Sequence, residues 1–302
     1  MKRTGIIGLG DMGSGIAKNL LAAGFEVTGH DLLEPRREAF AAMGGTLAPS
    51  AAAVGEASEA VFVMVMAGTE AKAVILGDPP REDRGLVATL RPGTSILLTS
   101  TVTPADARDI GRALEGSGID LIDSPVSGGY PGAQNGTLTL MAAGAAAALE
   151  READVMAAIS GTVHLVGTEI GMGQTVKACL QSLIGAVFSA TFEASVLAAK
   201  AGVDGDVLRR VLSSSSAGCT VVDTSLENIV ARRFERTGSH IRTMYKDLTI
   251  VMDLARELGV PLFTAGTAMQ LFQAGITKYP DADNWTVARI SEEIVDAGLA
   301  RE

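Results

Sequence analysis

A glycine-rich turn near the N-terminus constrains the fold of this chain more than any other feature. Residues 5–13 read GIIGLGDMG, which places a G-x-G-x-x-G pattern between a short apolar run and a helical stretch. Gly8 permits a tight turn, Gly10 has no side chain to obstruct a pyrophosphate, and Gly13 lets the helix lie close to the strand. In a chain with 35 glycines, the spacing alone is weak evidence for a nucleotide-binding turn. Its strand–turn–helix context nevertheless predicts a dinucleotide site at the helix N-terminus.

The first half of the chain alternates between short β-type runs and helical stretches. The segment AVFVMVM is apolar throughout, as is typical of a strand buried on both faces of a sheet. Alternation at this spacing indicates strand–helix–strand units and a mainly parallel, doubly wound α/β domain of the Rossmann type. Strands are expected at 4–8, 25–29, 60–66, 95–98 and 119–122, with 138–142 and 163–166 closing the sheet, and helices at 12–23, 35–43 and 104–115.

The pattern changes after about residue 168. Apolar and small residues occupy nearly every face of 174–201, which predicts a long, mostly buried helix. Strand signals stop, so we expect an α/β domain at 1–167 and an all-α substrate and oligomerisation domain at 168–302, with the long helix as the joint. Further helices are expected at 205–214, 220–232, 244–258, 263–274 and 284–298.

Composition narrows the class of protein. The chain has 302 residues, 47% of them hydrophobic, and a net charge of −10, which argues against nucleic acid or an anionic membrane as the main partner. Polar residues interrupt 178–199, the stretch nearest to a membrane span. Two cysteines without metal-ligand spacing, and an N-terminus unlike a signal peptide, favour a cytoplasmic protein without a metal. The apolar helical half favours a homodimer or homotetramer.

The second expected strand leads to Asp31, where an acidic residue would receive the ribose hydroxyls of adenosine. A carboxylate there repels a 2′-phosphate, and the two leucines after it offer no cation, which favours NAD over NADP. Arg36 and Arg37 keep NADP open, because either could reach a 2′-phosphate from the next helix. Asp31 could instead cap the helix that begins near Pro35.

Three later segments carry groups suited to chemistry. The segment DSPVSGG at 123–129 ends in a turn that can present a hydroxyl and backbone N–H groups to a carboxylate. The segment GMGQTVK at 171–177 ends in Lys177, and Gln181 follows one turn later on the same helix face. A lysine in an otherwise apolar helix is costly unless it is paired or functional. The third segment, YKDL at 245–248, begins another apolar helix with a charged pair.

These motifs together resemble the β-hydroxyacid dehydrogenase family over nearly the whole chain. The resemblance lies in GLGDMGSGIAKNL at 8–20, STVTP at 100–104, DSPVSGGYPGAQNGTLTLMAAG at 123–144, GMGQTVKACLQ at 171–181 and KDL at 246–248. Leu180 stands where many members have Asn, Leu98 where they have Asp, and Met66-Ala67-Gly68 where they have Leu-Pro. The segment 213–220 lacks the aromatic residues of some subfamilies. These departures leave the reaction class intact and the substrate open.

The resemblance implies a role for each matching residue. Lys177 would be the catalytic lysine, while Ser127, Gly128 and Gly129 would hold the substrate carboxylate. Gln181 would lie near the substrate, and Lys246 would reach both substrate and cofactor from the helical domain. The expected cofactor contacts are Gly8, Leu9, Gly10, Asp11, Met12, Gly13, Asp31, Met66, Ala67, Thr101 and Lys246, with Thr101 at the nicotinamide and Asp11 facing solvent.

The reaction implied is oxidation of a small 3-hydroxy acid or sugar acid, such as 3-hydroxyisobutyrate or threonate. Hydride would pass to NAD while Lys177 accepts the hydroxyl proton. Burial and the neighbouring Lys246 should then lower the pKa of Lys177 below its usual value of about 10.4. The alternatives are an NADPH-dependent reductase of a semialdehyde acid, such as tartronate or succinic semialdehyde, and an NAD-binding redox sensor without turnover.

Overall fold

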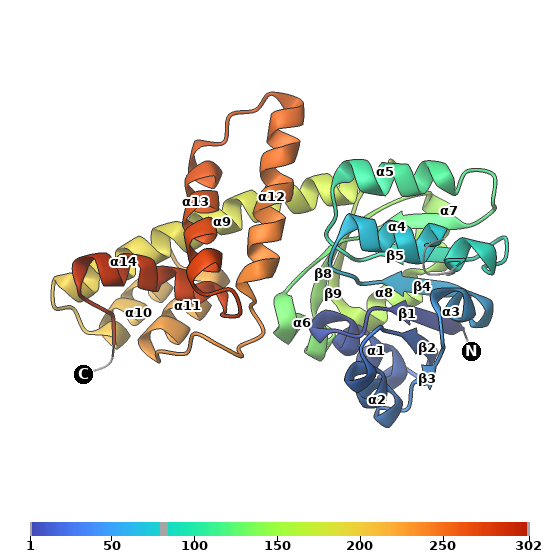
Figure 1. The fold of residues 1–302 in the computed structure, drawn as a ribbon, viewed down its shortest axis with the longest axis horizontal. Coiled ribbons are helices and arrows are strands. Elements are labelled where there is room, and N and C mark those ends of the chain that lie inside the picture. Colours follow the sequence, from blue (N-terminus) through green and yellow to red (C-terminus); the bar gives the residue numbers. More distant parts are fainter. Residues whose placement is uncertain (1, 79–83, 301–302) are drawn as a thin grey trace. The chain divides into compact units, whose positions relative to one another are not determined.

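The computed structural model describes residues 2–78 and 84–300, and these fall into two compact units that divide between Lys177 and Ala178. The first unit is built on a nine-stranded sheet in the order β3-β2-β1-β4-β5-β6-β8-β7, with β9 also paired to β8 (Figure 1). Its strands are β1 Arg3–Ile7, β2 Glu26–His30, β3 Thr46–Leu47, β4 Ala60–Val63, β5 Ser95–Leu98, β6 Asp120–Asp123, β7 Val126–Ser127, β8 Leu138–Ala143 and β9 Ser160–Gly167.

Most strand pairs are parallel, and the first six strands follow the Rossmann order 3-2-1-4-5-6. Among the described strands, β8 alone runs antiparallel to its neighbours β6 and β7, while β9 returns parallel to β8. The helices of this unit are α1 Asp11–Ala22, α2 Glu34–Ala42, α3 Ala51–Ala57, α4 Gly68–Leu76, α5 Pro104–Ala113, α6 Gly129–Asn135, α7 Ala146–Arg151 and α8 Ala153–Ile159. The structure therefore confirms the predicted fold class.

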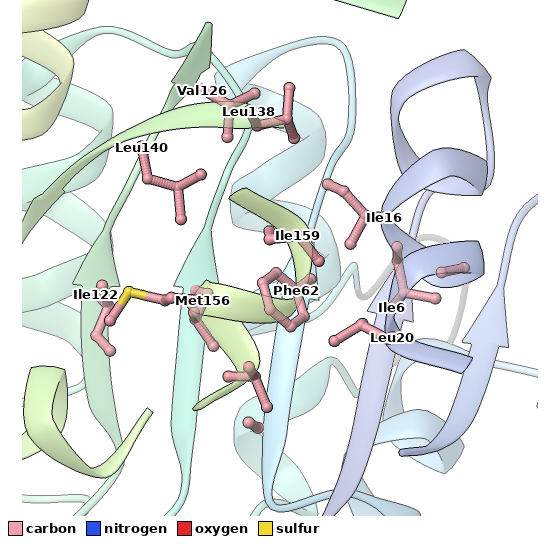
Figure 2. Packing of buried hydrophobic residues seen from close by; sticks show 14 of the residues in the cluster. Ile6, Ile16, Leu20, Phe62, Ile122, Val126, Leu138, Leu140, Met156 and Ile159 are labelled. Carbon is pink, nitrogen blue, oxygen red and sulfur yellow. The ribbon is translucent and has the colours of Figure 1, made fainter. Parts of the chain in front are cut away.

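Neighbouring residues of the central strands bury their side chains on opposite faces of the sheet, because side chains alternate along a strand. Ile6 of β1 and Phe62 of β4 pack with Leu20 of α1 in one fully buried cluster (Figure 2). Ile7 and Val63 of the same strands pack in a second cluster with residues of α3, α4 and α5. Both faces are thus covered, and the carboxyl ends of β1, β4 and β5 stay together at one edge.

The helical unit forms around α9 Met172–Lys200, whose first turns belong to the sheet unit. The remaining helices are α10 Gly205–Ser214, α11 Thr220–Val230, α12 Ile241–Leu258, α13 Phe263–Lys278 and α14 Ala288–Val295, the last preceded by a 3₁₀ turn at Asn284–Val287. Phe188 and Phe192 of α9 contact Phe272 of α13, and Phe188 also contacts Trp285, with ring centroids 5.8–6.4 Å apart. Much of the chain's small aromatic content is concentrated in this core.

Among the described residues, α9 is the one helix that is long and apolar enough to cross a membrane, with 29 residues and a mean hydropathy of 1.6 in its most apolar window. The core helix of a folded helical bundle has the same properties. Phe188, Phe192 and Ala198 of α9 are buried against α11, α12 and α13. We therefore assign α9 as the core helix of the second unit.

The structure differs from the sequence-based expectation at several elements. The strand expected at 60–66 ends at Val63, because the following residues leave the sheet and pass beside the glycine turn. The helix expected at 284–298 begins as a 3₁₀ turn and ends at Val295, because the following residue, Asp296, has a left-handed backbone. Helices α3, α4, α6, α7 and α8 were not expected. They are short and rich in Ala and Gly, so their sequences carry little helical periodicity.

Candidate active site

The three glycines of the N-terminal turn are held by different constraints. Gly8 has φ +91°, and a Cβ there would lie 2.2 Å from the backbone oxygen of Met64. A Cβ on Gly13 would lie 1.9 Å from the backbone oxygen of Gly8. Among the described residues that are not its chain neighbours, the group nearest to a Cβ on Gly10 would be the Arg36 guanidinium, at 3.6 Å. The fold itself thus excludes side chains at Gly8 and Gly13, whereas the open space at Gly10 fits the close approach of a pyrophosphate.

Helix α1 begins at this turn without a side-chain cap, since its N-cap residue is Gly10. An uncapped helix N-terminus presents backbone N–H groups and the positive end of the helix dipole to an anion. Leu9 is buried, Asp11 is exposed, as expected, and Met12 packs at the edge of the core. The residues present therefore fit the phosphates of a dinucleotide.

Asp31 follows β2 directly, as expected, but its carboxylate is mostly engaged by the chain. One oxygen accepts the Leu9 N–H at 2.8 Å, and the other accepts the Leu33 N–H, also at 2.8 Å. The Arg36 guanidinium lies 3.3 Å from the first oxygen, and Arg37 donates to the backbone oxygen of Asp31. Asp31 is not the helix cap, because α2 begins after Leu33. It ties the glycine turn to the end of β2 and brings Arg36 beside Gly10.

Two further expected cofactor segments follow neighbouring strands. Met66 and Ala67 come after β4, and Thr101 comes after β5. Ser100 joins these segments, because its hydroxyl accepts the Val65 N–H at 2.8 Å and donates to the Val63 carbonyl at 3.1 Å. The structure therefore brings both segments to the edge of the sheet that carries the glycine turn, which is where ligands bind in doubly wound folds.

The expected carboxylate anchor lies between β7 and α6. Ser127 ends β7, and Gly128 and Gly129 follow with φ +124° and +58°. Two successive left-handed residues turn the backbone sharply and can direct neighbouring N–H groups toward one point, where an anion can bind. The local geometry fits the expected role of the Ser-Gly-Gly turn.

Lys177 lies in the second turn of α9 and is buried, with 6% of its surface exposed. It belongs to the same unit as the glycine turn and Ser127. Gln181 follows one turn later and belongs to the helical unit, where it is equally buried. A buried amine on an apolar helix is unusual for lysine and is typical of a functional group.

In the helical unit, Gln181 and Lys246 meet at Asp247, the acidic member of the charged pair in the YKDL segment. The Gln181 amide donates to one carboxylate oxygen of Asp247 at 2.5 Å, and the Lys246 ammonium lies 3.0 Å from the other. Asp247 is buried, while about a quarter of the Lys246 side chain is exposed. Because an ionised carboxylate only accepts hydrogen bonds, it fixes the amide of Gln181 with its NH₂ toward Asp247 and leaves the oxygen for another partner.

Asp123 and Gln174 are also buried polar residues that the sequence placed inside motifs without assigning them a function. Both lie in the sheet unit, at the end of β6 and the start of α9. Their position within the DSPVSGG and GMGQTVK segments was the sequence feature that could have indicated a role for them. Their contacts depend on the tertiary packing of these two segments.

Comparison with known proteins agrees with this geometry. A family model for the NAD binding domain of 6-phosphogluconate dehydrogenase matches residues 3–167, and one for the NAD-binding of NADP-dependent 3-hydroxyisobutyrate dehydrogenase matches 171–291. An L-threonate dehydrogenase of Escherichia coli O6:H1 is 35% identical, over 97% of this chain and 96% of that protein. An NAD-dependent L-serine dehydrogenase of Pseudomonas aeruginosa is 32% identical, over 90% and 92%.

Among solved structures, a 3-hydroxyisobutyrate dehydrogenase from Salmonella typhimurium superimposes with a TM-score of 0.87. It is 30% identical, and the match covers 96% of this chain and all of that one. Similarity therefore extends through both units, from the glycine turn to the last helices. The chain belongs to the β-hydroxyacid dehydrogenase family, whose members are NAD(P)-dependent oxidoreductases acting on CH–OH groups.

Proposed function

We propose that the protein oxidises a small 3-hydroxy carboxylic acid or sugar acid, threonate or 3-hydroxyisobutyrate being the nearest models, with NAD as the cofactor. The observation that carries the proposal is the buried Lys177 in the unit that also holds the glycine turn and the Ser-Gly-Gly turn. The relatives named for L-threonate, L-serine and 3-hydroxyisobutyrate support a substrate that has both a hydroxyl and a carboxylate.

The residues divide the work between binding and proton transfer. Ser127 and the N–H groups of the Ser-Gly-Gly turn hold the substrate carboxylate. NAD, when bound, supplies the acceptor for the hydride that leaves the carbinol carbon. The Lys177 amine accepts the hydroxyl proton in the oxidation and returns it in the reverse reaction. Within the helical unit, Asp247 fixes the Gln181 amide and leaves its oxygen as a hydrogen-bond acceptor, which fits the substrate-binding role that the family resemblance implies for Gln181.

A panel of hydroxy acids, assayed by the absorbance of the reduced nicotinamide, tests the proposal. The Lys177→Ala variant should lose kcat by about 10²–10⁴-fold on the best substrate, because it lacks the proton acceptor. Lys200→Ala, at the far end of the same helix, is the matched control and should keep normal turnover. Near-normal turnover by Lys177→Ala would refute the role of Lys177. Binding of NAD without turnover of any acid would favour the redox sensor.

One observation favours a second candidate, an NADPH-dependent reductase of a semialdehyde acid. The Arg36 guanidinium lies beside Gly10 and Asp31, where it could contact a 2′-phosphate. The same panel run with NADP⁺, and with semialdehydes plus NADPH, distinguishes the two candidates. A higher kcat/KM with NADP⁺ or NADPH than with NAD⁺ or NADH would favour the reductase.

A further inference from the structure

The first turn of α9 is held by a cluster of buried polar groups outside the residues assigned above. Asp123, the last residue of β6, is fully buried, and Gln174, in the first turn of the helix, is 1% exposed. Within the part of the chain that the structure describes, neither side chain is hydrogen-bonded to the glycine turn or to the Ser-Gly-Gly turn. Buried polar side chains are costly unless their hydrogen bonds are made, so the contacts of this pair define its purpose.

Asp123 anchors the backbone of the helix start. One carboxylate oxygen accepts the Gly171 N–H at 2.9 Å and the Gln174 N–H at 3.2 Å. A carboxylate at a helix N-terminus also interacts favourably with the helix dipole. The helix lies so close that a Cβ on Gly173 would be 2.6 Å from the backbone oxygens of Asp123 and Met141. The beginning of α9 therefore has little freedom to shift along or away from the sheet.

Gln174 fixes the same turn to the segment that follows β5. Its amide nitrogen donates to the other oxygen of Asp123 at 2.8 Å and to the Ser100 carbonyl at 3.1 Å. Its amide oxygen accepts the Val102 N–H at 3.0 Å. The side chain thus bonds to the residues on both sides of Thr101, the position expected at the nicotinamide. No residue that only donates or only accepts can make all three bonds.

We propose that Gln174 is a positioning residue that holds Lys177 and the Ser100–Val102 segment in one rigid frame. The inference rests on the proposed function, in which Lys177 moves the proton while hydride leaves the same carbinol. Lys177 follows Gln174 by three residues and so lies almost on the same face of the helix, one turn later. A rotation of the first turn would move the amine relative to the nicotinamide-side segment, and displacements of about 1 Å can cost about 100-fold in rate.

The test compares Gln174→Met with Gln270→Met, a matched change at an exposed glutamine of α13. Gln174→Met keeps the length and the apolar stem but makes none of the three bonds. We expect kcat to fall about 10- to 100-fold with little change in the Kd for NAD⁺. We also expect hydrogen exchange in 171–177 and 100–103 to become about tenfold faster, with no change in α1. Gln270→Met should match the parent protein in all these measurements.

A second variant tests the inference in case Gln174→Met does not fold. Gln174→Glu is nearly isosteric and can still accept the Val102 N–H, but its other oxygen faces the Ser100 carbonyl and the Asp123 carboxylate. It should show the same local increase in exchange and a reduced kcat. Normal exchange in 171–177 in a folded variant would overturn the inference, as would normal kcat.

If Lys177→Ala loses turnover while both Gln174 variants keep it, the inference fails and the proposed function stands. If Lys177→Ala keeps turnover, the proton-transfer role of Lys177 fails while the oxidation itself stands, and the exchange measurements alone decide whether Gln174 fixes the helix start.

Discussion

At the scale of single residues, Gly8, Gly10 and Gly13 occupy one turn but are required for different reasons. Gly8 and Gly13 are required by contacts with the backbone of the protein itself. Gly10 has an ordinary φ of −67°, and the structure leaves room for a Cβ there. The fold could thus tolerate alanine at Gly10, so the absence of a side chain there is explained by the ligand.

Gly10→Ala should therefore fold normally and bind NAD⁺ more weakly. Overpacking against a bound pyrophosphate costs about 1–3 kcal/mol, or roughly 5-fold to 150-fold in Kd. Titration of cofactor binding and a thermal melt measure the two effects. Gly13→Ala is the comparison, and it should lower the melting temperature because its Cβ would collide with the Gly8 carbonyl. Equal losses of stability in both variants would contradict this explanation.

At the scale of elements, α9 and α12 are joined by the packing of the Leu248 side chain against Gly185 and by a buried polar pair. A Cβ on Gly185 of α9 would lie 2.8 Å from the Leu248 side chain of α12. Near this contact, Asp247 of α12 accepts from Gln181 of α9 and pairs with Lys246. The carboxylate thus links two helices and sets the direction of the Gln181 amide.

Asp247→Ala should lower the free energy of unfolding by about 1–3 kcal/mol, because it leaves the buried Gln181 amide without its acceptor. Urea denaturation measures this loss. The variant should also lower kcat/KM, since the Gln181 amide can then rotate. Asp253→Ala, at an exposed residue of the same helix, is the control and should change neither quantity. An unchanged unfolding free energy in Asp247→Ala would show that the pair contributes nothing to the packing of the two helices.

At the scale of the whole molecule, burial of Asp123 makes stability depend on pH. Burial raises the pKa of Asp123 from 3.8 to about 6, although hydrogen bonds from Gln174 and the helix N–H groups oppose the rise. Between about pH 4 and 6 the folded protein holds a proton that the unfolded chain has released. The contribution of Asp123 to the free energy of unfolding therefore falls as pH rises through this window, by about 3 kcal/mol in total.

The direction of this pH dependence can be tested with unfolding curves, measured at a series of pH values for the parent protein and for Asp123→Asn. The parent's unfolding free energy relative to the variant should fall between about pH 4 and 6 and then level off. Asp109 provides the opposite case, because the hydrogen bond from Lys72 lowers the pKa of its carboxyl. Relative to Asp109→Asn, the parent should gain stability as pH rises through the acid range. A parent that gains stability relative to Asp123→Asn over the same window would contradict the raised pKa.

The sequence by itself determined the class of fold, the glycine turn and the positions of Asp31 and Lys177. These follow from local rules: alternating strands and helices, the steric freedom of glycine, and a lysine on an apolar helix. The sequence did not predict short helices such as α3 and α4, because Ala- and Gly-rich segments of about two turns carry too little helical periodicity. The sequence also did not predict the exact ends of strands, since β4 ends where tertiary contacts with the glycine turn begin.

Only the tertiary structure decided how the polar residues are paired. Asp123 and Gln174 are 51 positions apart, and Gln181 and Asp247 are 66 positions apart, yet each pair forms a buried hydrogen bond. No local pattern encodes such a partner, because the pairing arises when separate elements pack and their polar groups must be satisfied together. Asp31 illustrates both levels: the sequence placed it at the end of a strand, and packing directed its carboxylate to the Leu9 N–H, within the glycine turn itself.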